Sequence, residues 1–282
     1  MGRAWHFLRR WPVVPLFIMG VLILAALFAP VIAPADPIKS SLRDNLAPPV
    51  WYPDGTNQYL LGADDIGRDL LSRVIFGARI SVVVASVSLI SGMTLGIGLG
   101  LISGYYGGLI DEVIMRIVDV WIAMPFILFA LVIVTVFGQN LLIMIGLLAA
   151  LAWSGFVRNI RAEVLQLRES GYVAYSRVSG ASDLRILARH VFPGVTSTAV
   201  VIATIRVGSL ILAEASLSFL GAGVPDPTPS WGVMVANGRE FIATAWWVAF
   251  FPGLAIFLVV MSLNFLGDWA RDRLDPRLSQ VD

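Results

Sequence analysis

The sequence predicts an all-α membrane protein with six transmembrane helices. Of its 282 residues, 57% are hydrophobic and 14% are charged, and the mean hydropathy of +0.81 lies outside the usual range of soluble domains. Four stretches contain no Asp, Glu, Lys or Arg, at 11–35, 80–110, 120–157 and 241–267. Each is long enough to cross a hydrocarbon core of about 30 Å, which takes about 20 helical residues.

The remaining spans follow from the lengths of these stretches. The first, at 11–35, is too long for the core of a signal peptide and lacks a good cleavage site, which favours a retained helix. The run 120–157 is too long for one crossing and contains the polar segment GQN at 138–140, so we divide it into two spans. A further span at 195–213 is interrupted only by Arg206.

The chain is therefore expected to divide into four parts. These are a cytoplasmic tail with the first helix (1–35), an extracytoplasmic loop (36–79), a five-helix core (80–267) with a cytoplasmic loop (158–193), and a C-terminal tail (268–282). Six spans put both termini on one side of the membrane. Most arginines lie in the N-terminus, the 158–190 loop and the C-terminus, so the positive-inside rule places these segments in the cytoplasm.

The extracytoplasmic loop ends in LLGADDIGRDLLSRVIFGAR, at 60–79, which has the pattern of an amphipathic helix. Ile66 and Leu70 fall on one helical face, whereas Arg68, Asp69 and Arg73 fall on the other. This pattern predicts a helix that lies in the membrane interface. Asp69 and Arg73 are spaced to form an ion pair across one turn.

The second span carries glycines at strict four-residue spacing, at Gly92, Gly96, Gly100 and Gly104. Such a stripe lets another helix approach closely, so we expect a packing interface there. It is not a phosphate-binding loop, because Lys39 is the only lysine of the chain and no GK[ST] motif exists. Any ATP and Mg²⁺ must therefore be bound by partner subunits, and this chain has no cofactor of its own.

The sequence disfavours an enzyme. A catalyst within the membrane would need paired acids, a Ser and His pair or an HExxH helix, whereas the spans supply one Arg and one Glu. The two histidines, His6 and His190, are far apart and lack clustered acids, so no metal site is expected. The chain has no cysteine, which excludes disulfides and thiol chemistry.

The cytoplasmic loop is expected to hold two helices separated at Ser179 and Gly180. The second one has Asp183 in its first turn and Arg189 near its last turn, as the helix dipole favours, and Pro193 is expected to end it. Leu184, Leu187, Ala188 and Val191 form its apolar stripe. The neutral alternative is a solvated loop whose basic residues merely obey the positive-inside rule.

Several motifs resemble one transporter family. Gly180 and Pro193 keep the spacing of the EAA loop in permease subunits of ATP-binding-cassette (ABC) importers, although Ala174, Tyr175, Ser176 and Phe192 depart from its consensus. The stretches LGADDIGRDLLSRVIFGARIS, GYYGGLIDEVIMRIVD, AEASLSFLGAGVPDPTPSWGVM and NFLGDWARDRLDPR are similar to those of the C-type permease of dipeptide, oligopeptide and nickel importers. Together they cover the chain from about 60 to 277.

The resemblance implies the type I importer permease fold in the inner membrane of a prokaryote. It also implies a second permease subunit, two ATPase subunits and an extracytoplasmic solute-binding protein as partners. The second cytoplasmic helix becomes a coupling helix seated on an ATPase; its residues are Gly180, Ala181, Ser182, Asp183, Leu184, Arg185, Leu187 and Arg189. The extracytoplasmic motif comprises Asp64, Gly67, Arg68, Asp69 and Arg73.

Charged residues inside the membrane are functional candidates, because a central arginine costs about 2.5–3.5 kcal/mol on insertion scales. Arg206 and Glu214 are the candidates for the translocation path, and Arg206 is expected to attract a substrate carboxylate. The alternative is that Arg206 bonds helix carbonyls or a partner acid. For Glu214 a structural role at the outer end of its helix is favoured. Asp111, Glu112, Arg116 and Asp119 are read as helix-end charges or support for the coupling loop.

The expected function is thus a permease subunit for short peptides. Chelated nickel, glutathione or small saccharides are the alternative substrates, because the binding protein sets much of the selectivity. A gradient-driven secondary transporter is the second alternative, since Arg206 and Glu214 suit such a cycle, although no inverted repeat is visible.

Overall fold

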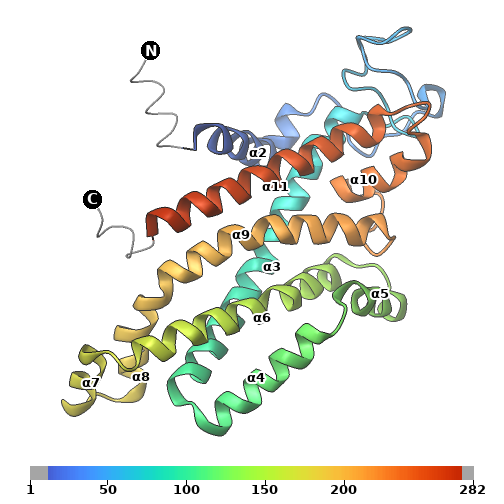
Figure 1. Cartoon of the computed structure of the whole chain (residues 1–282). Coiled ribbons are helices and arrows are strands. Elements are labelled where there is room, and N and C mark those ends of the chain that lie inside the picture. Colours follow the sequence, from blue (N-terminus) through green and yellow to red (C-terminus); the bar gives the residue numbers. More distant parts are fainter. Residues whose placement is uncertain (1–11, 275–282) are drawn as a thin grey trace, which may run out of the picture.

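A computed structural model describes residues 12–274 of the chain, which form helices and no sheet (Figure 1). The all-helical fold that the sequence predicts is therefore confirmed. The helices are α2 (Val13–Ile32), α3 (Leu70–Tyr106), α4 (Gly108–Ala123), α5 (Phe126–Phe137), α6 (Leu141–Leu167), α7 (Gly171–Val178), α8 (Asp183–Ile186), α9 (Phe192–Phe219), α10 (Trp231–Gly238) and α11 (Trp247–Leu274). Short turns η1 (Leu42–Asp44) and η3 (Arg239–Phe241) are 3₁₀-helical, and η2 (Leu187–Val191) is π-helical.

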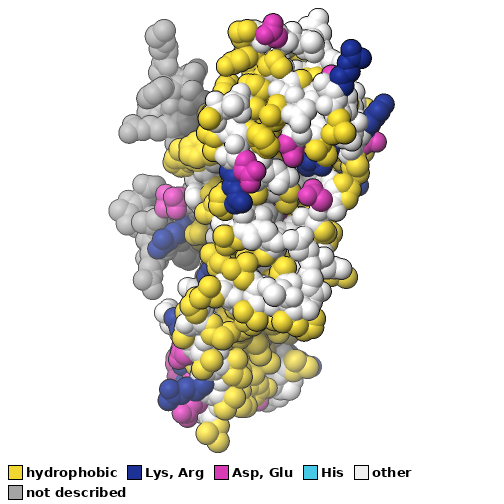
Figure 2. All heavy atoms as spheres, turned by 90° about the vertical axis from the view of Figure 1, so that its right-hand side faces the viewer, with side chains coloured by type: hydrophobic (Ala, Val, Ile, Leu, Met, Phe, Trp, Pro, Cys, Tyr) yellow, Lys and Arg dark blue, Asp and Glu magenta, His cyan; other side chains and the backbone are white. Residues whose placement is uncertain are grey.

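The long helices pack beside one another, and the loops that connect them lie at two opposite ends of the molecule (Figure 1). Figure 1 shows α7 and α8 at one end of α6 and α9, and α10 with the 36–69 loop at the other. Charged side chains gather over the upper part and the lower edge of the face in Figure 2, with a largely uncharged band between them. This distribution suits a chain whose middle lies in lipid.

Among the described residues, five helices are long and apolar enough to cross a membrane, and the pair α4 and α5 makes a sixth span if it is counted as one. The expected third span at 120–137 differs from this arrangement, because α4 and α5 meet at an angle of 83°. Pro125 explains the break: it disfavours helical angles for the residue before it, and Met124 is extended with ψ 129°.

The glycine stripe of α3 lies against α6. A Cβ added at Gly92, Gly96, Gly100 or Gly104 would lie within 3.0 Å of an α6 atom, and at Gly96 it would be 2.5 Å from the carbonyl oxygen of Trp153. The two backbones are therefore close enough that no side chain fits between them at these positions.

The expected interfacial helix at 60–79 is wrong. Residues 60–69 form a folded loop, and the helix that begins at Leu70 is α3 itself, which continues for 37 residues. Asp69 caps it, since its side chain accepts a hydrogen bond from the amide of Ser72 at 2.8 Å. The polar face is not in water, because Arg73 is 1% exposed; its charge is buried against the 36–69 loop.

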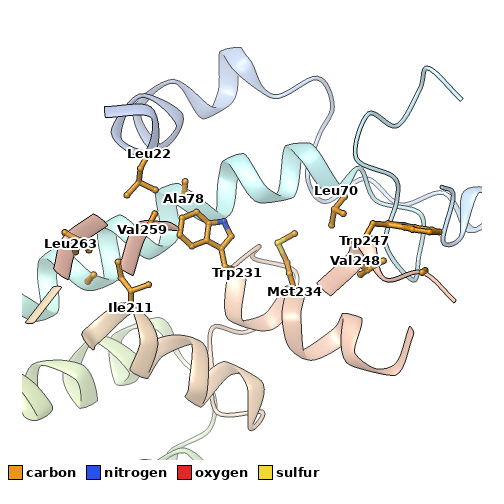
Figure 3. Packing of buried hydrophobic residues seen from close by; sticks show 12 residues of the cluster. Leu22, Leu70, Ala78, Ile211, Trp231, Met234, Trp247, Val248, Val259 and Leu263 are labelled. Carbon is orange, nitrogen blue, oxygen red and sulfur yellow. The ribbon is translucent and has the colours of Figure 1, made fainter. Parts of the chain in front are cut away.

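One core cluster joins α10 to the long helices at the end of the bundle that carries the 36–69 loop. Trp231 lies at the centre of Figure 3, between residues of α3, α9 and α11, and its indole donates to the carbonyl oxygen of Val74 at 2.9 Å. Gly77 makes room for this ring, because a Cβ there would lie 2.6 Å from it. The short helix α10 is thereby fixed against α3.

Candidate functional site

Buried charges hold the 36–69 loop together. The Nε of Arg68 lies 2.6 Å from Oδ2 of Asp64, and the Nε of Arg73 lies 3.4 Å from the same oxygen. Arg73 also donates to the carbonyl oxygen of Pro37 at 3.1 Å. Asp64 is therefore shared by two guanidinium groups, and the expected pair between Asp69 and Arg73 is wrong, because Asp69 caps α3 instead.

Gly67 of the same motif has a structural reason to be a glycine. Its φ is +77°, and a Cβ there would lie 1.9 Å from the carbonyl oxygen of Ser41. The motif thus lies against the segment around Ser41 within the same loop, where the amide of Ser41 donates to the carbonyl oxygen of Ile66 at 3.2 Å.

A cavity of about 500 Å³ opens beside this cluster. Asp65 lines it together with Asp226, Glu240 and Arg239, so most of its ionisable groups are acids. Burial, and then the neighbouring charge of Asp64, raise the pKa of the Asp65 carboxyl.

The 158–193 segment has its expected break between two helices. The helix α7 ends at Val178, and Gly180 follows with a φ of +79°, which a residue with a side chain rarely adopts. Ser182 stands at the N-cap position of the next helix and Asp183 in its first turn. The residues before the break form two helices rather than one, since α6 ends at Leu167 and α7 begins at Gly171.

The expected end of the coupling helix at Pro193 is wrong. The helical backbone that begins at Asp183 continues to Phe219. Pro193 stands in the first turn of α9, directly after the π-helical turn η2, in which the amide of Phe192 donates to the carbonyl oxygen of Leu187. The wider π-turn accommodates a proline that would otherwise clash with the carbonyl group four residues earlier. The coupling segment and α9 are consequently one continuous helical rod.

The inner face of this segment is anchored in the bundle. Ile186 and Val191 are completely buried in a cluster with residues of α3, α6 and α9. The hydroxyl of Tyr105, at the end of α3, donates to Asp183 at 2.8 Å, and Arg177 lies over the ring of Tyr105. Sequence reasoning missed Tyr105 and Ile186. Ile186 lies five residues before Val191, which is not a same-face spacing on an α-helix, and the two residues share a buried face only because of the π-helical turn η2. Tyr105 gives no signal in the sequence.

The side of the 171–191 segment that faces away from the bundle carries exposed apolar side chains. Tyr175, Val178 and Leu184 are 76%, 88% and 77% exposed. Arg185 and Arg189 are also exposed, whereas Leu187 packs inward. The predicted stripe of Leu184, Leu187, Ala188 and Val191 is thus divided between the two faces, and α7 contributes apolar surface that the sequence pattern did not single out.

Of the four charged residues of α4 that were singled out from the sequence, two pair with arginines of α6. Asp111 binds Arg161 and accepts from Ser103 of α3, and Asp119 pairs with Arg158 at 2.7 Å. Only Glu112 and Arg116 pair within α4, at 4.0 Å. These bonds join α3, α4 and α6 to one another.

The two charged candidates of α9 lie in different surroundings. Glu214 is 2% exposed, and the hydroxyl of Ser218 donates to its carboxylate at 2.7 Å. Arg206 is half-buried and lies against Gly155 of α6, where an added Cβ would be 2.1 Å from its Nη2. Glu214 is thus enclosed by its own subunit, whereas part of Arg206 is accessible.

Comparisons with known proteins identify the family. Residues 96–280 match the model of the binding-protein-dependent transport system inner membrane component, and residues 2–49 match the N-terminal transmembrane domain of oligopeptide transport permease C. A di/tripeptide transport system permease protein of Pseudomonas aeruginosa is 41% identical over 94% of this chain and 88% of the relative. A dipeptide transport system permease protein of Escherichia coli is 42% identical over 98% of this chain and 93% of the relative.

Two further comparisons complete the assignment. A glutathione transport system permease protein of Pectobacterium atrosepticum is 43% identical over 79% of this chain and 74% of the relative. An inward-facing structure of the MetNI methionine ABC transporter has the same fold, with a TM-score of 0.58 and 20% identity over 73% of this chain and 97% of that chain. The resemblance seen in the sequence is confirmed: the chain is a multi-pass inner membrane protein that belongs to the family of binding-protein-dependent transport system inner membrane components.

Proposed function

We propose that this chain is the non-catalytic permease subunit of an ATP-driven importer of short peptides. It pairs with a second permease subunit, two ATPase subunits that bind ATP and Mg²⁺, and an extracytoplasmic solute-binding protein. The names of the relatives support a di- or tripeptide as the substrate, and glutathione, itself a modified tripeptide, as the alternative. Both termini lie in the cytoplasm in this arrangement.

The observation that carries the proposal is the continuous helical rod from Asp183 to Phe219. Its first residues present Leu184, Arg185 and Arg189 outward, and α7 adds Tyr175 and Val178 beside them. Large apolar side chains on a charged loop are typical of a protein interface. An ATPase subunit that grips this surface therefore acts directly on α9, without a flexible joint between the two.

The anchoring contacts make the rod part of the bundle. Tyr105 bonds Asp183, and Ile186 and Val191 are buried among residues of α3 and α6. A displacement of the coupling segment therefore shifts α3 and α6 together with α9. Such a shift is the kind of rigid-body change by which a transporter alternates between outward- and inward-open states.

The proposal is tested by placing a charge on the exposed apolar surface. Leu184→Asp, in a tagged chain expressed with its partner subunits, is expected to reduce the amount of ATPase that co-purifies and to abolish ATP-driven peptide uptake in proteoliposomes. The thermal stability of the purified subunit is expected to stay unchanged, because Leu184 is 77% exposed.

Leu42→Asp is the matched control, because Leu42 is equally exposed at 77% but lies at the opposite end of the molecule. This variant is expected to retain its ATPase subunits. If Leu184→Asp retains both the ATPase subunits and uptake, the coupling surface is wrong. If uptake by the wild type persists without any ATPase subunit and follows an ion gradient, the protein is a secondary transporter.

A further inference from the structure

The guanidinium group of Arg206 is an unpaired charge near the middle of a membrane-spanning helix. Among the described residues, no carboxylate lies within ion-pair distance of it and no hydrogen bond reaches it. Its side chain is half-buried, so part of it is accessible from outside the subunit. A charge in this position requires a partner, because lipid does not solvate it.

The guanidinium group of Arg206 fits against α6 because residue 155 is a glycine. A Cβ at Gly155 would lie 2.1 Å from Nη2, 2.9 Å from Cζ and 3.1 Å from Nε of Arg206. The guanidinium group therefore occupies the space that a side chain at Gly155 would take. The Gly155 carbonyl oxygen already accepts a hydrogen bond from Asn159 at 2.8 Å.

The nearby hydroxyl groups of α9 donate to backbone carbonyl oxygens and not to the guanidinium group of Arg206. The hydroxyl of Thr204 donates to the carbonyl oxygen of Val200 at 2.9 Å, and that of Ser209 donates to the carbonyl oxygen of Arg206 at 2.9 Å. Ser209 is exposed and lies one turn from the half-buried Arg206 on the same side of α9, whereas Thr204 lies on the opposite side. The side of α9 that carries Arg206 therefore also carries an exposed hydroxyl.

From this geometry we infer that Arg206, held against Gly155, binds the C-terminal carboxylate of a peptide in transit. The inference rests on the proposed function. A guanidinium offers two parallel N–H groups to a carboxylate, and every unmodified peptide carries such a group at neutral pH. The site lies on the same rod as the coupling segment, so an ATPase-driven displacement of that segment moves Arg206 together with the α6 backbone against which it lies.

The test uses the complete importer in proteoliposomes with the dipeptide Ala-Ala and its C-terminal amide. Each is supplied at a concentration that saturates the binding protein, with loading measured separately, and uptake is expressed per loaded binding protein. Arg206→Met is expected to reduce uptake of the free acid by about tenfold or more, and uptake of the amide by less than about twofold. Arg206→Lys is expected to retain more free-acid uptake than Arg206→Met, because it keeps the charge but not the fork.

Glycine variants on α6 test the cradle itself. Gly155→Ala places a methyl group where the guanidinium lies and is expected to lower free-acid uptake selectively. Gly146→Ala is the matched control, because nothing lies within 4 Å of a Cβ at that position of the same helix. ATP hydrolysis stimulated by loaded binding protein is expected to persist in all four variants, which separates this inference from the coupling function that Leu184→Asp tests.

Three results would overturn the inference. The first is unchanged free-acid uptake in Arg206→Met. The second is an equal fall for the acid and the amide, which means that the charge does not act on the carboxylate. The third is loss of the second permease subunit on purification of both Arg206→Met and Arg206→Lys, which means that Arg206 pairs with an acid of that subunit.

Discussion

The two polar loops at opposite ends of the molecule use similar residues in opposite ways. In the 36–69 loop, Asp64 and Arg68, with Arg73 of α3 beside them, are each at most 5% exposed, and their charges face one another. In the 158–193 segment, Arg185 and Arg189 are exposed beside the apolar Leu184. The charges around the first loop therefore hold this subunit together, whereas those of the second are available to another protein. Burial separates the two roles, although both loops look equally charged in the sequence.

Removing the carboxylate of Asp64, which pairs with both Arg68 and Arg73, is expected to reduce stability more than any other change proposed here. Asp64→Ala leaves the guanidinium groups of Arg68 and Arg73 buried without their main partner, which typically costs about 3–5 kcal/mol in the free energy of unfolding. We expect a large drop in melting temperature in detergent, or loss of folded protein. Glu169→Ala is the control: its pair with Arg168 is exposed, so the change is expected to stay within about 1 kcal/mol. Equal melting of Asp64→Ala and wild type would contradict a structural role for the outer cluster.

An intermediate effect is expected where the 158–193 segment contacts the end of α3. Tyr105→Phe removes the hydrogen bond to Asp183 and should cost about 1 kcal/mol in the free energy of unfolding. Peptide-stimulated ATP hydrolysis and uptake should fall more clearly, because the bond joins the coupling segment to α3. Tyr106→Phe, on the adjacent exposed side chain, provides the comparison and should leave both assays at wild-type values. If the two variants behave alike, the coupling segment acts on the bundle through its apolar anchors alone.

The sequence predicts the helices well because their causes are local. Charge-free length marks the spans, and the four-residue glycine spacing marks the face of α3 that packs on α6. The break at Gly180 also follows from one residue, since its φ of +79° favours glycine. Periodicity and single-residue backbone preferences thus suffice for these features.

The failures arise where distant segments meet. The polar face of residues 66–75 predicted exposure to water. Arg73 is buried instead, because it pairs with Asp64 and donates a hydrogen bond to the carbonyl oxygen of Pro37. Pro193 suggested a helix end, but the π-turn before it carries the helix onward. Gly155 gave no signal at all, since its role depends on Arg206 of another helix. No pattern within one segment encodes such contacts.

The smallest effect is expected from Asp65, which belongs to the outer motif but borders the open cavity. Burial raises its pKa in the folded state, so between the unfolded and folded pKa values the native protein binds more protons than the unfolded chain. The free energy of unfolding therefore decreases as pH rises through that window, and Asp65→Asn removes this decrease. The melting temperature of Asp65→Asn relative to wild type should increase from acidic to neutral pH, by a small amount because solvent screens this partly exposed group. Asp54→Asn, on an exposed part of the same loop, controls for the loss of one negative charge. If the difference in melting temperature does not change with pH, burial does not disfavour the ionised form of Asp65 in the folded protein. The expected contrast with Asp64, whose charge is paired with two arginines, would then be wrong.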